Sequence, residues 1–165
     1  MNYNLTGKGI FVFSDPAGAN SVLALIDRLI ENGYNAENYL VFTDSLGVFS
    51  DDYKELVIKQ AIEPDQINQL LTKYNPDYLF SATSIHDYEH QWRKLANRLN
   101  IKTIGFIDHW TNYLERFSFK NETIFPDEIW VINEIAKKEA IQAGIPERLI
   151  TISGNPYYEK VKNFS

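Results

Sequence analysis

Short apolar runs alternate with helical stripes along most of the chain. Four of the runs are rich in β-branched and aromatic residues, end at turn formers, and span residues 9–13, 39–43, 78–82 and 101–107. Between the first two runs, apolar residues recur at helical spacing, at Val22, Leu25, Ile26, Leu29 and Ile30. Strands that alternate with helices of this length favour parallel pairing through right-handed crossovers. The pattern therefore predicts an α/β fold: a doubly wound, mostly parallel, Rossmann-like sheet of six to seven strands with helices on both faces.

The rest of the chain continues this alternation. Two further helical stripes are Ile67, Leu70, Leu71 and Tyr74, and Tyr88, Trp92, Leu95, Ala96 and Leu99. We predict short strands near 56–58, 128–132 and 149–152, with a helix that Asn133 caps between the last two. Residues 110–126 show no clean period, so we expect a long loop with one helical turn at most.

Composition limits what the chain can bind. The net charge of -6 and the pI near 5.1 would repel a phosphate backbone, so nucleic acid is not an expected partner. With no cysteine, the chain can form neither disulfides nor thiolate metal sites. No stretch approaches the roughly 18 apolar residues of a membrane span. We expect one domain in the cytoplasm, free or peripheral at the inner face of the membrane.

The leading candidate site is Asp108-His109-Trp110, which follows the strand at 101–107. Ligands of doubly wound sheets bind beyond the carboxyl ends of the strands, so these side chains should face the crevice. An imidazole or a carboxylate there can take a proton from an attacking hydroxyl near neutral pH. Asp108 and His109 are therefore predicted catalytic residues, although adjacent side chains usually diverge. The alternative is that Asp108 caps a turn and His109 packs beneath the next loop.

A second cluster follows the strand at 78–82. His86 is another candidate base, and Ser84 a candidate substrate-binding residue, unless Ser84 or Asp87 merely caps the next helix. Residues 86–90 also spell His-x-x-Glu-His, a pattern found in some zinc enzymes. A metalloprotease needs a third ligand and a different surrounding fold, so we assign no metal site and expect His90 to be an ordinary polar residue on the surface.

The loop at residues 14–20 joins the first strand to the first helix. Its backbone N–H groups could hold a phosphate or sugar oxygen, which makes Ser14, Asp15, Gly18 and Asn20 candidate substrate-binding residues. The loop lacks both the Gly-x-Gly-x-x-Gly pattern and a P-loop lysine, and no cofactor is predicted. The alternative is a tight connection in which Gly18 lets the helix pack closely.

The long loop adds Trp110, Asn112 and Arg116 to the candidate substrate-binding residues. Aromatic faces and hydrogen-bonding side chains of this kind occur in carbohydrate sites, and an arginine can contact an anionic group. A loop that is simply fixed by its own buried aromatics would carry the same residues.

Two segments of the chain carry a family resemblance. Residues 130–133 (Trp-Val-Ile-Asn) and 143–156 (Ala-Gly-Ile-Pro-Glu-Arg-Leu-Ile-Thr-Ile-Ser-Gly-Asn-Pro) resemble the end of the N-terminal domain in GT-B glycosyltransferases and the related UDP-sugar 2-epimerases. Residues 75–83 also resemble their mid-domain strand. The resemblance implies an N-terminal, acceptor-side Rossmann-like domain at residues 1–156, with an interdomain linker or truncated tail at 157–165.

The function implied is the acceptor-binding half of a GT-B glycosyltransferase. It would receive a glycan or lipid-linked acceptor, while a C-terminal domain or partner chain absent from this sequence would hold the nucleotide-sugar donor. Surface polysaccharide synthesis is the expected setting. Two alternatives stay open: a UDP-sugar 2-epimerase-like domain, and a ligand-binding doubly wound domain without turnover.

Overall fold

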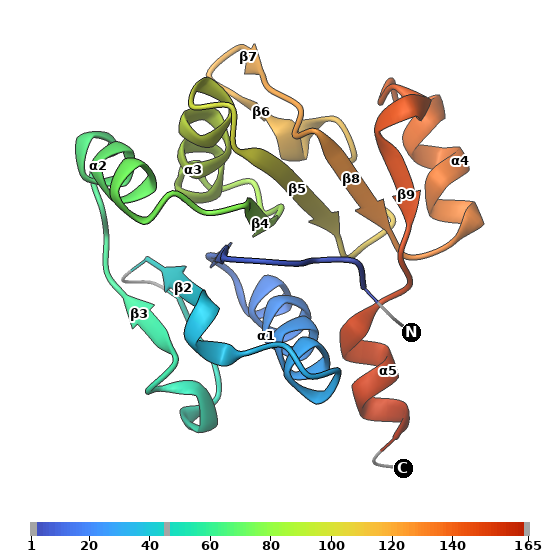
Figure 1. Cartoon of the computed structure of the whole chain (residues 1–165). Helices are drawn as coiled ribbons and strands as arrows, with labels where there is room; N and C mark the ends of the chain where they lie inside the picture. Colours follow the sequence, from blue (N-terminus) through green and yellow to red (C-terminus); the bar gives the residue numbers. More distant parts are fainter. Residues whose placement is uncertain (1–2, 45–46, 164–165) are drawn as a thin grey trace.

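The computed structural model describes residues 3–44 and 47–163. Its main sheet has seven parallel strands in the order β3-β2-β1-β4-β5-β8-β9 (Figure 1). The strands are β1 (Gly9–Phe13), β2 (Tyr39–Thr43), β3 (Val57–Lys59), β4 (Tyr78–Ala82), β5 (Lys102–Ile107), β8 (Glu128–Val131) and β9 (Ile150–Ile152). The order reverses at β1, as a doubly wound fold requires, so the predicted fold class is confirmed.

Helices cover both faces of the sheet. They are α1 (Pro16–Glu31), α2 (Pro64–Tyr74), α3 (Asp87–Arg98), α4 (Glu134–Gln142) and α5 (Pro156–Lys162). Figure 1 shows α1 and α5 on one side of the central strands and α2 and α3 on the other. Single 3-10 turns occur at η1 (Ala36–Asn38), η2 (Asp51–Tyr53), η3 (Glu115–Phe117) and η4 (Glu147–Leu149). Among the described residues, we find no helix with the length and apolar character needed to cross a bilayer.

The core is divided between the two faces of the sheet by the alternation of strand side chains. In β1, Phe11 and Phe13 pack in the cluster that includes α1, whereas Ile10 and Val12 join the cluster formed by α2 and α3. All four are fully buried, and burial of each such side chain contributes about 1.5–3 kcal/mol. A buried central strand of this kind gives the continuous apolar run seen in the sequence.

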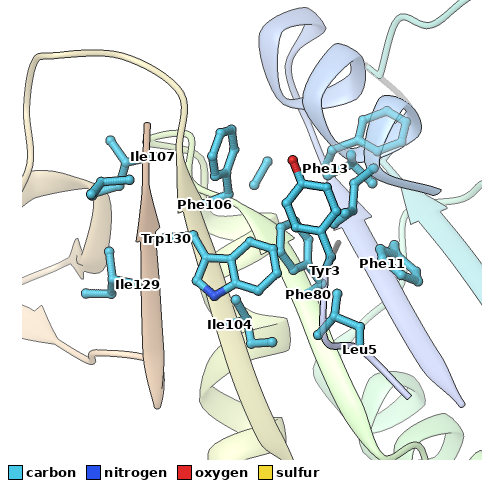
Figure 2. Packing of buried hydrophobic residues seen from close by; sticks show 14 of the residues in the cluster. Tyr3, Leu5, Phe11, Phe13, Phe80, Ile104, Phe106, Ile107, Ile129 and Trp130 are labelled. Carbon is cyan, nitrogen blue, oxygen red and sulfur yellow. The ribbon is translucent and has the colours of Figure 1, made fainter. Parts of the chain in front are cut away.

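The N-terminal residues complete the first of these clusters. Tyr3 stacks on Trp130 with ring centroids 5.5 Å apart, and Trp130 meets Phe80 edge-on at 5.2 Å (Figure 2). Leu5 is buried in the same cluster. Tyr3 and Leu5, which precede β1, therefore belong to the core.

Side-chain caps fix the starts of two helices, and α1 begins at Pro16, inside the segment 14–20 that was predicted to be a loop. Asp15 Oδ1 accepts a hydrogen bond from Gly18 N at 2.6 Å at the start of α1, where Pro16 occupies the first turn. Asn133 Oδ1 accepts from Ala136 N at 2.9 Å at the start of α4, as predicted. These caps fix the directions in which the chain leaves β1 and β8.

The long segment after β5 contains a hairpin that the sequence analysis missed. Strands β6 (Ser118–Phe119) and β7 (Glu122–Thr123) pair antiparallel, following the single turn η3. Lys120 and Asn121 form the connection with φ of 47° and 64°, the left-handed pair typical of two-residue hairpin turns. Strands of two residues are too short to show an alternating pattern, so nothing in the sequence signalled them.

Residues 157–162 belong to helix α5, although they lie in the segment 157–165 that was predicted to be linker or tail. Asn155 caps α5 by accepting from Tyr157 N at 3.0 Å, and the helix packs against α1. Lys160 Nζ donates to Asp27 Oδ2 at 2.8 Å across this contact. The chain therefore still contacts α1 beyond residue 156, and the predicted domain boundary stays a prediction.

Candidate functional site

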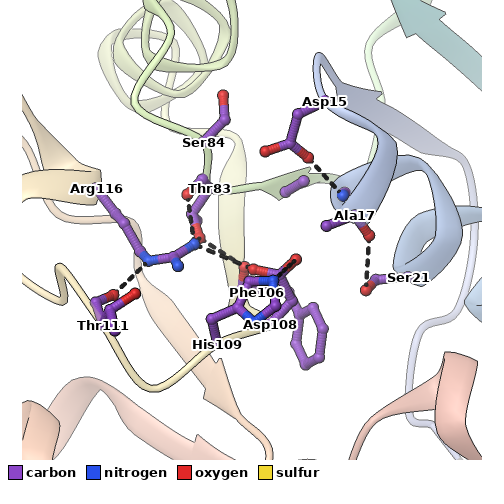
Figure 3. Close-up of polar contacts among 12 residues, drawn as sticks. Asp15, Ala17, Ser21, Thr83, Ser84, Phe106, Asp108, His109, Thr111 and Arg116 are labelled. Atoms are coloured by element: carbon purple, nitrogen blue, oxygen red, sulfur yellow. Dashed lines mark hydrogen bonds and ion pairs between the residues drawn. The ribbon is translucent and has the colours of Figure 1, made fainter. Parts of the chain in front are cut away.

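The candidate site lies at the carboxyl edge of the three central strands. β1, β4 and β5 are adjacent and parallel, so the residues that follow them come out at one edge of the sheet. These residues are Ser14 after β1, Thr83 and Ser84 after β4, and Asp108 after β5. Figure 3 shows Ser84, Thr83, Asp108 and Asp15 around this edge. The shared edge predicted for the β4 and β5 turns is therefore present.

Arg116 from the long loop connects the ends of β4 and β5. Its Nη1 donates to Thr83 O at 2.8 Å and to Asp108 Oδ1 at 3.1 Å, and its Nε donates to Thr111 O at 3.0 Å (Figure 3). The side chains of Arg116 and Asp108 are only 10% and 12% exposed, which limits screening by water. Arg116 thus holds the Asp108 carboxylate in place rather than extending into solvent.

His109 is an exposed titratable group that lies beside Asp108 at this edge. Its side chain is 56% exposed, and its Nε2 lies 3.8 Å from Asp108 Oδ2. Asp108 therefore stands between a guanidinium on one oxygen and an imidazole on the other. A proton accepted by His109 would be stabilised by the adjacent carboxylate, as in other carboxylate–imidazole pairs. The alternative in which His109 packs beneath the loop is wrong.

His86 lies on the same edge without joining this pair. It is exposed and is the N-cap residue of α3, and its backbone N–H donates to Ser84 Oγ at 3.2 Å. No contact joins the His86 side chain to Asp108 or His109 among the described residues. Neither Ser84 nor Asp87 caps α3 with its side chain, so that prediction is wrong.

Ser14 and Ser84 are joined by a buried carboxylate. Glu89, on the first turn of α3, is fully buried, and its Oε1 accepts from Ser14 Oγ at 2.9 Å, from Ser84 N at 2.9 Å and from Ser84 Oγ. The two serine oxygens lie 2.8 Å apart. Burial raises the pKa of Glu89 above its usual value, against the lowering effects of Arg93 and of the serine hydrogen bonds.

One helical turn further along α3, Arg93 is also buried. Its Nη1 donates to Ser81 Oγ at 3.0 Å and to Ala82 O at 3.1 Å, and its Nη2 donates to Arg116 O at 3.1 Å. The guanidinium lies over the Phe117 ring, 5.5 Å from its centroid. Burial lowers the pKa of Arg93 to about 10, partly offset by the charge of Glu89. Arg93 thus ties the end of β4 to the long loop.

The loop after β1 packs tightly against β4. A Cβ on Gly18 would lie 2.6 Å from Ala82 Cβ and 2.9 Å from Asp15 Oδ1, so only glycine fits. Asp15 already occupies the Gly18 N–H, which leaves one donor fewer for a phosphate at the start of α1. These contacts favour the close-packing alternative for Gly18, while Asn20 is exposed on α1.

Within the long loop, buried and exposed aromatics separate. Tyr113 and Phe117 are buried, and the Tyr113 hydroxyl donates to Glu139 Oε2 at 2.8 Å. Trp110 is 45% exposed. Asn112 has a φ of 53°, and its carbonyl accepts from Arg116 N at 3.2 Å. The loop is thus fixed by some of its own aromatics and still presents Trp110 beside His109.

His90 was expected to be an exposed polar residue, and this prediction is wrong. His90 is buried beside Phe119 of the hairpin, with its Nε2 3.4 Å from Glu122 Oε1. Among residues 3–44 and 47–163, no group of three or more His, Asp or Glu side chains could hold a metal ion. In the His-x-x-Glu-His segment, Glu89 binds serines and His90 binds Glu122, so their functional groups do not converge.

Sequence reasoning missed Glu89 and Arg93 as site residues. Both are charged and lie outside the apolar stripe predicted for this helix, yet both are buried alongside Trp92 and Ala96. The available signal was their spacing: positions 89, 93 and 96 follow the helical period of the buried face. The polar Ser81 and Thr83 at the end of an otherwise apolar strand were a second signal for buried partners.

Comparison with known proteins identifies the fold. No protein-family model and no curated protein matched the sequence. The solved UDP-GlcNAc 2-epimerase from Methanocaldococcus jannaschii matches with a TM-score of 0.60 and 16% identity over 90% of this chain and 45% of that chain. The S. aureus MnaA–UDP co-structure matches at 0.68 and 11%, over 97% and 48%. UDP-N-acetylglucosamine 2-epimerase from Rickettsia bellii matches at 0.64 and 12%, over 96% and 48%.

The topology and its edge cluster define a doubly wound α/β domain with a candidate ligand site at the carboxyl ends of its central strands. More specifically, the chain shares its fold with part of two solved UDP-GlcNAc 2-epimerases, in agreement with the Rossmann-like domain that the sequence resemblance implied. It spans less than half the length of each solved structure reported above.

Proposed function

We propose that this chain is the acceptor-binding half of a GT-B-type glycosyltransferase. It receives a glycan or lipid-linked acceptor in surface polysaccharide synthesis, and a second lobe or partner chain supplies the nucleotide-sugar donor. The observation that carries the proposal is the Asp108–His109 pair at the carboxyl edge, with His109 exposed and Asp108 held by Arg116. The GT-B-like fold supports the same assignment.

In this proposal His109 is the general base. Its imidazole takes the proton from the acceptor hydroxyl, whose oxygen then bonds to the anomeric carbon of the donor sugar. The bond from that carbon to the nucleoside diphosphate breaks, and the diphosphate leaves with the electron pair. Asp108, 3.8 Å from His109 Nε2, stabilises the imidazolium that forms. Arg116 keeps Asp108 oriented through the hydrogen bond from its Nη1 to Asp108 Oδ1.

The acceptor would lie across the turns around this pair. Trp110 offers a half-exposed ring beside His109 on which a sugar can stack. His86 lies at the neighbouring turn as a second candidate base, and Asn20 and Asn112 offer exposed amides. Ser14, Asp15, Gly18 and Ser84 shape the floor between these turns, so we assign them to the form of the crevice.

The test is turnover of a nucleotide sugar by the full-length protein. His109→Ala should lower kcat about 10²–10⁴-fold, the usual contribution of a general base, with a similar loss for Asp108→Ala and a smaller loss for His86→Ala. Lys102→Ala is the matched control, since Lys102 lies at the amino end of β5, on the opposite edge. Unimpaired rates in all three site variants would remove the assignment.

A UDP-sugar 2-epimerase is the second candidate. It is favoured by the two solved UDP-GlcNAc 2-epimerases that match this chain with TM-scores of 0.60 and 0.64. An epimerase converts the nucleotide sugar itself and requires no acceptor. Product analysis separates the two: an epimerised nucleotide sugar without added acceptor indicates the second candidate, and a glycosylated acceptor with free nucleoside diphosphate indicates the first.

Nucleotide titration of the chain alone distinguishes both from a binding domain without turnover. An acceptor-side half should bind UDP only weakly, because the donor contacts belong to the other lobe. Micromolar binding of UDP by these 165 residues, measured by calorimetry, would argue against an acceptor-side role.

A further inference from the structure

We propose that Glu89 and Arg93 are positioning residues, which together hold the three turns of the candidate site in their relative places from one turn of helix α3. The inference rests on the proposed function only for what those turns bind. Neither residue need touch a ligand, because each acts through the backbone and side chains that it holds.

The two residues divide the turns between them. Glu89 holds the turns after β1 and β4, through Ser14 Oγ at 2.9 Å and Ser84 N at 2.9 Å. Arg93 holds the end of β4 and the long loop after β5, through Ala82 O at 3.1 Å and Arg116 O at 3.1 Å. Arg116 in turn holds Asp108. Every segment that forms the edge is therefore connected to α3 by a buried charged side chain.

The hydroxyl protons of Ser14 and Ser84 are used for hydrogen bonds within the Glu89 cluster. With Glu89 ionised, two hydroxyl protons are shared among its Oε1 and the two serine oxygens, which lie 2.8 Å apart. Both protons are used inside the cluster, and Ser84 Oγ also accepts from His86 N at 3.2 Å. Ser14 and Ser84 are only 5% and 8% exposed. Their hydroxyls therefore join turns to Glu89 and have no proton left for a ligand.

Stability alone does not account for two buried charges here. Glu89 Oε2 and Arg93 Nε have no hydrogen-bond partner among the described residues, and no hydrogen bond joins the two side chains there. Buried charges that are incompletely paired are usually less stable than apolar residues of similar size. What the pair provides, and Leu and Met would not, is a set of directed bonds to three separate turns.

Hydrogen–deuterium exchange on the full-length protein tests this without any ligand. Glu89→Leu should speed exchange about tenfold or more in residues 14–18 and 83–86, with little change in 108–117. Arg93→Met should speed exchange in 82–84 and 108–117 instead. Glu89→Gln keeps a carbonyl acceptor for Ser84 N and should restore the slow exchange. Arg98→Met, an exposed arginine on the same helix, is the matched control and should change none of these segments.

Turnover then tests whether the positions matter. In the Glu89→Leu protein, assayed at a temperature where circular dichroism shows that it is folded, kcat/KM with a nucleotide sugar should fall at least about tenfold, and Glu89→Gln should recover most of the loss. Uniform loosening of all amides, unchanged exchange at the turns, or full activity in a protein with loosened turns would each overturn the inference. If His109→Ala keeps full activity while the exchange pattern holds, the proposed function fails and the positioning role stands.

Discussion

Two clusters of charged side chains differ mainly in their exposure to water. One lies near the start of α1, at the carboxyl edge of the sheet, and the other near the end of α1. Under the carboxyl edge, Glu89 and Arg93 are fully buried and bind Ser14, Ser84 and backbone carbonyls. At the α1–α5 contact, Lys160 Nζ binds Asp27 Oδ2 at 2.8 Å and Tyr53 Oη at 2.5 Å, but the Lys160 and Asp27 side chains are 36% and 33% exposed. Each cluster joins segments that are distant in sequence.

Water changes what each cluster does for the fold. Burial raises the pKa of Glu89 and lowers the pKa of Arg93. Both shifts favour the neutral form, so burying the two charged forms costs free energy. For Lys160 burial also lowers the pKa, but the hydrogen bonds to Asp27 and Tyr53 raise it more, and the net direction is upward. The partly exposed Lys160 cluster therefore keeps its charges at little desolvation cost and contributes little to stability. The buried Glu89–Arg93 cluster carries a large desolvation cost and is strongly coupled to its surroundings.

A cavity lies beside the Lys160–Asp27 cluster. Its volume is about 310 Å³, and it lies between α1 and α5, away from the strand ends. Its lining residues are Tyr3, Ala24, Asp27, Arg28, Glu31, Pro156, Glu159, Lys160 and Asn163. None of them was a predicted site residue, and no described histidine lies among them. This cavity and the Asp108–His109 pair thus lie in different regions. We place the candidate site at the pair, because the acid–base side chains are there.

The largest effect that could break this comparison is loss of Arg93. Arg93→Met leaves Glu89 without a compensating charge and removes the Arg93 donors to Ala82 O and Arg116 O. The free energy of unfolding should fall by about 3–5 kcal/mol, measured by urea denaturation. Adding Glu89→Leu should recover part of that loss, because the unpaired charge is then gone. A fall below about 1 kcal/mol for Arg93→Met would show that the buried cluster is no more coupled than the exposed one.

Close packing at the same edge predicts the next effect. Gly18→Ala places a Cβ 2.6 Å from Ala82 Cβ, and neither backbone can move without shifting α1 or β4. Overpacking of this kind costs about 1–3 kcal/mol, which a shift in thermal unfolding would report. Asn20→Ala, exposed on the same helix, is the control and should change stability by less than about 0.5 kcal/mol. Equal effects for the two variants would mean that the edge tolerates movement.

At the exposed cluster the expected effect is smaller. Lys160→Met removes the contacts with Asp27 and Tyr53 and should lower the free energy of unfolding by about 1 kcal/mol or less, since exposed ion pairs are screened. The loss should shrink further in high salt. Lys73→Met, an exposed lysine on α2, is the reference variant. A loss as large as that of Arg93→Met would erase the distinction between the two clusters.

Sequence patterns predicted the elements whose burial follows a single period. The strands at 9–13, 39–43 and 78–82 fall on the residues predicted, because central strands of a parallel sheet are apolar throughout. The start of α4 was also correct, since Asn133 is a cap with a local mechanism. The hairpin at 118–123 and the helix α5 were missed, because both are short and depend on contacts with distant residues.

The candidate site shows the same division. Position at a strand end was enough to place Asp108 and His109 at the carboxyl edge, and to place Ser14 and Ser84 near them. The partners of these residues were not predictable, because Glu89 and Arg116 reach them through the fold and not through the chain. A charged residue at a helical core position reads as solvent-facing until its partner is known.

A third charged contact is intermediate in burial and should show the smallest effect. His90 on α3 is buried, and it meets Glu122 of the hairpin, which is half exposed. Burial lowers the pKa of His90, while Glu122 opposes the shift by raising it. A folded-state pKa below the unfolded value of about 6.5 means that the unfolded chain binds more protons, so stability should decline as the pH falls from about 7.5 to 5.5.

His90→Gln should flatten that decline. The measurement is the difference between wild type and variant in the free energy of unfolding at several pH values, so that other titrating groups cancel. Because the Glu122 contact offsets part of the burial effect, the wild-type slope attributable to His90 should stay well below the single-proton maximum of about 1.4 kcal/mol per pH unit. A variant that declines as steeply as wild type would place the titration elsewhere. If the His90 contribution to stability instead rises as the pH falls, the Glu122 contact outweighs burial. The His90–Glu122 contact would then resemble the Lys160 cluster, in which the hydrogen bonds to Asp27 and Tyr53 outweigh burial.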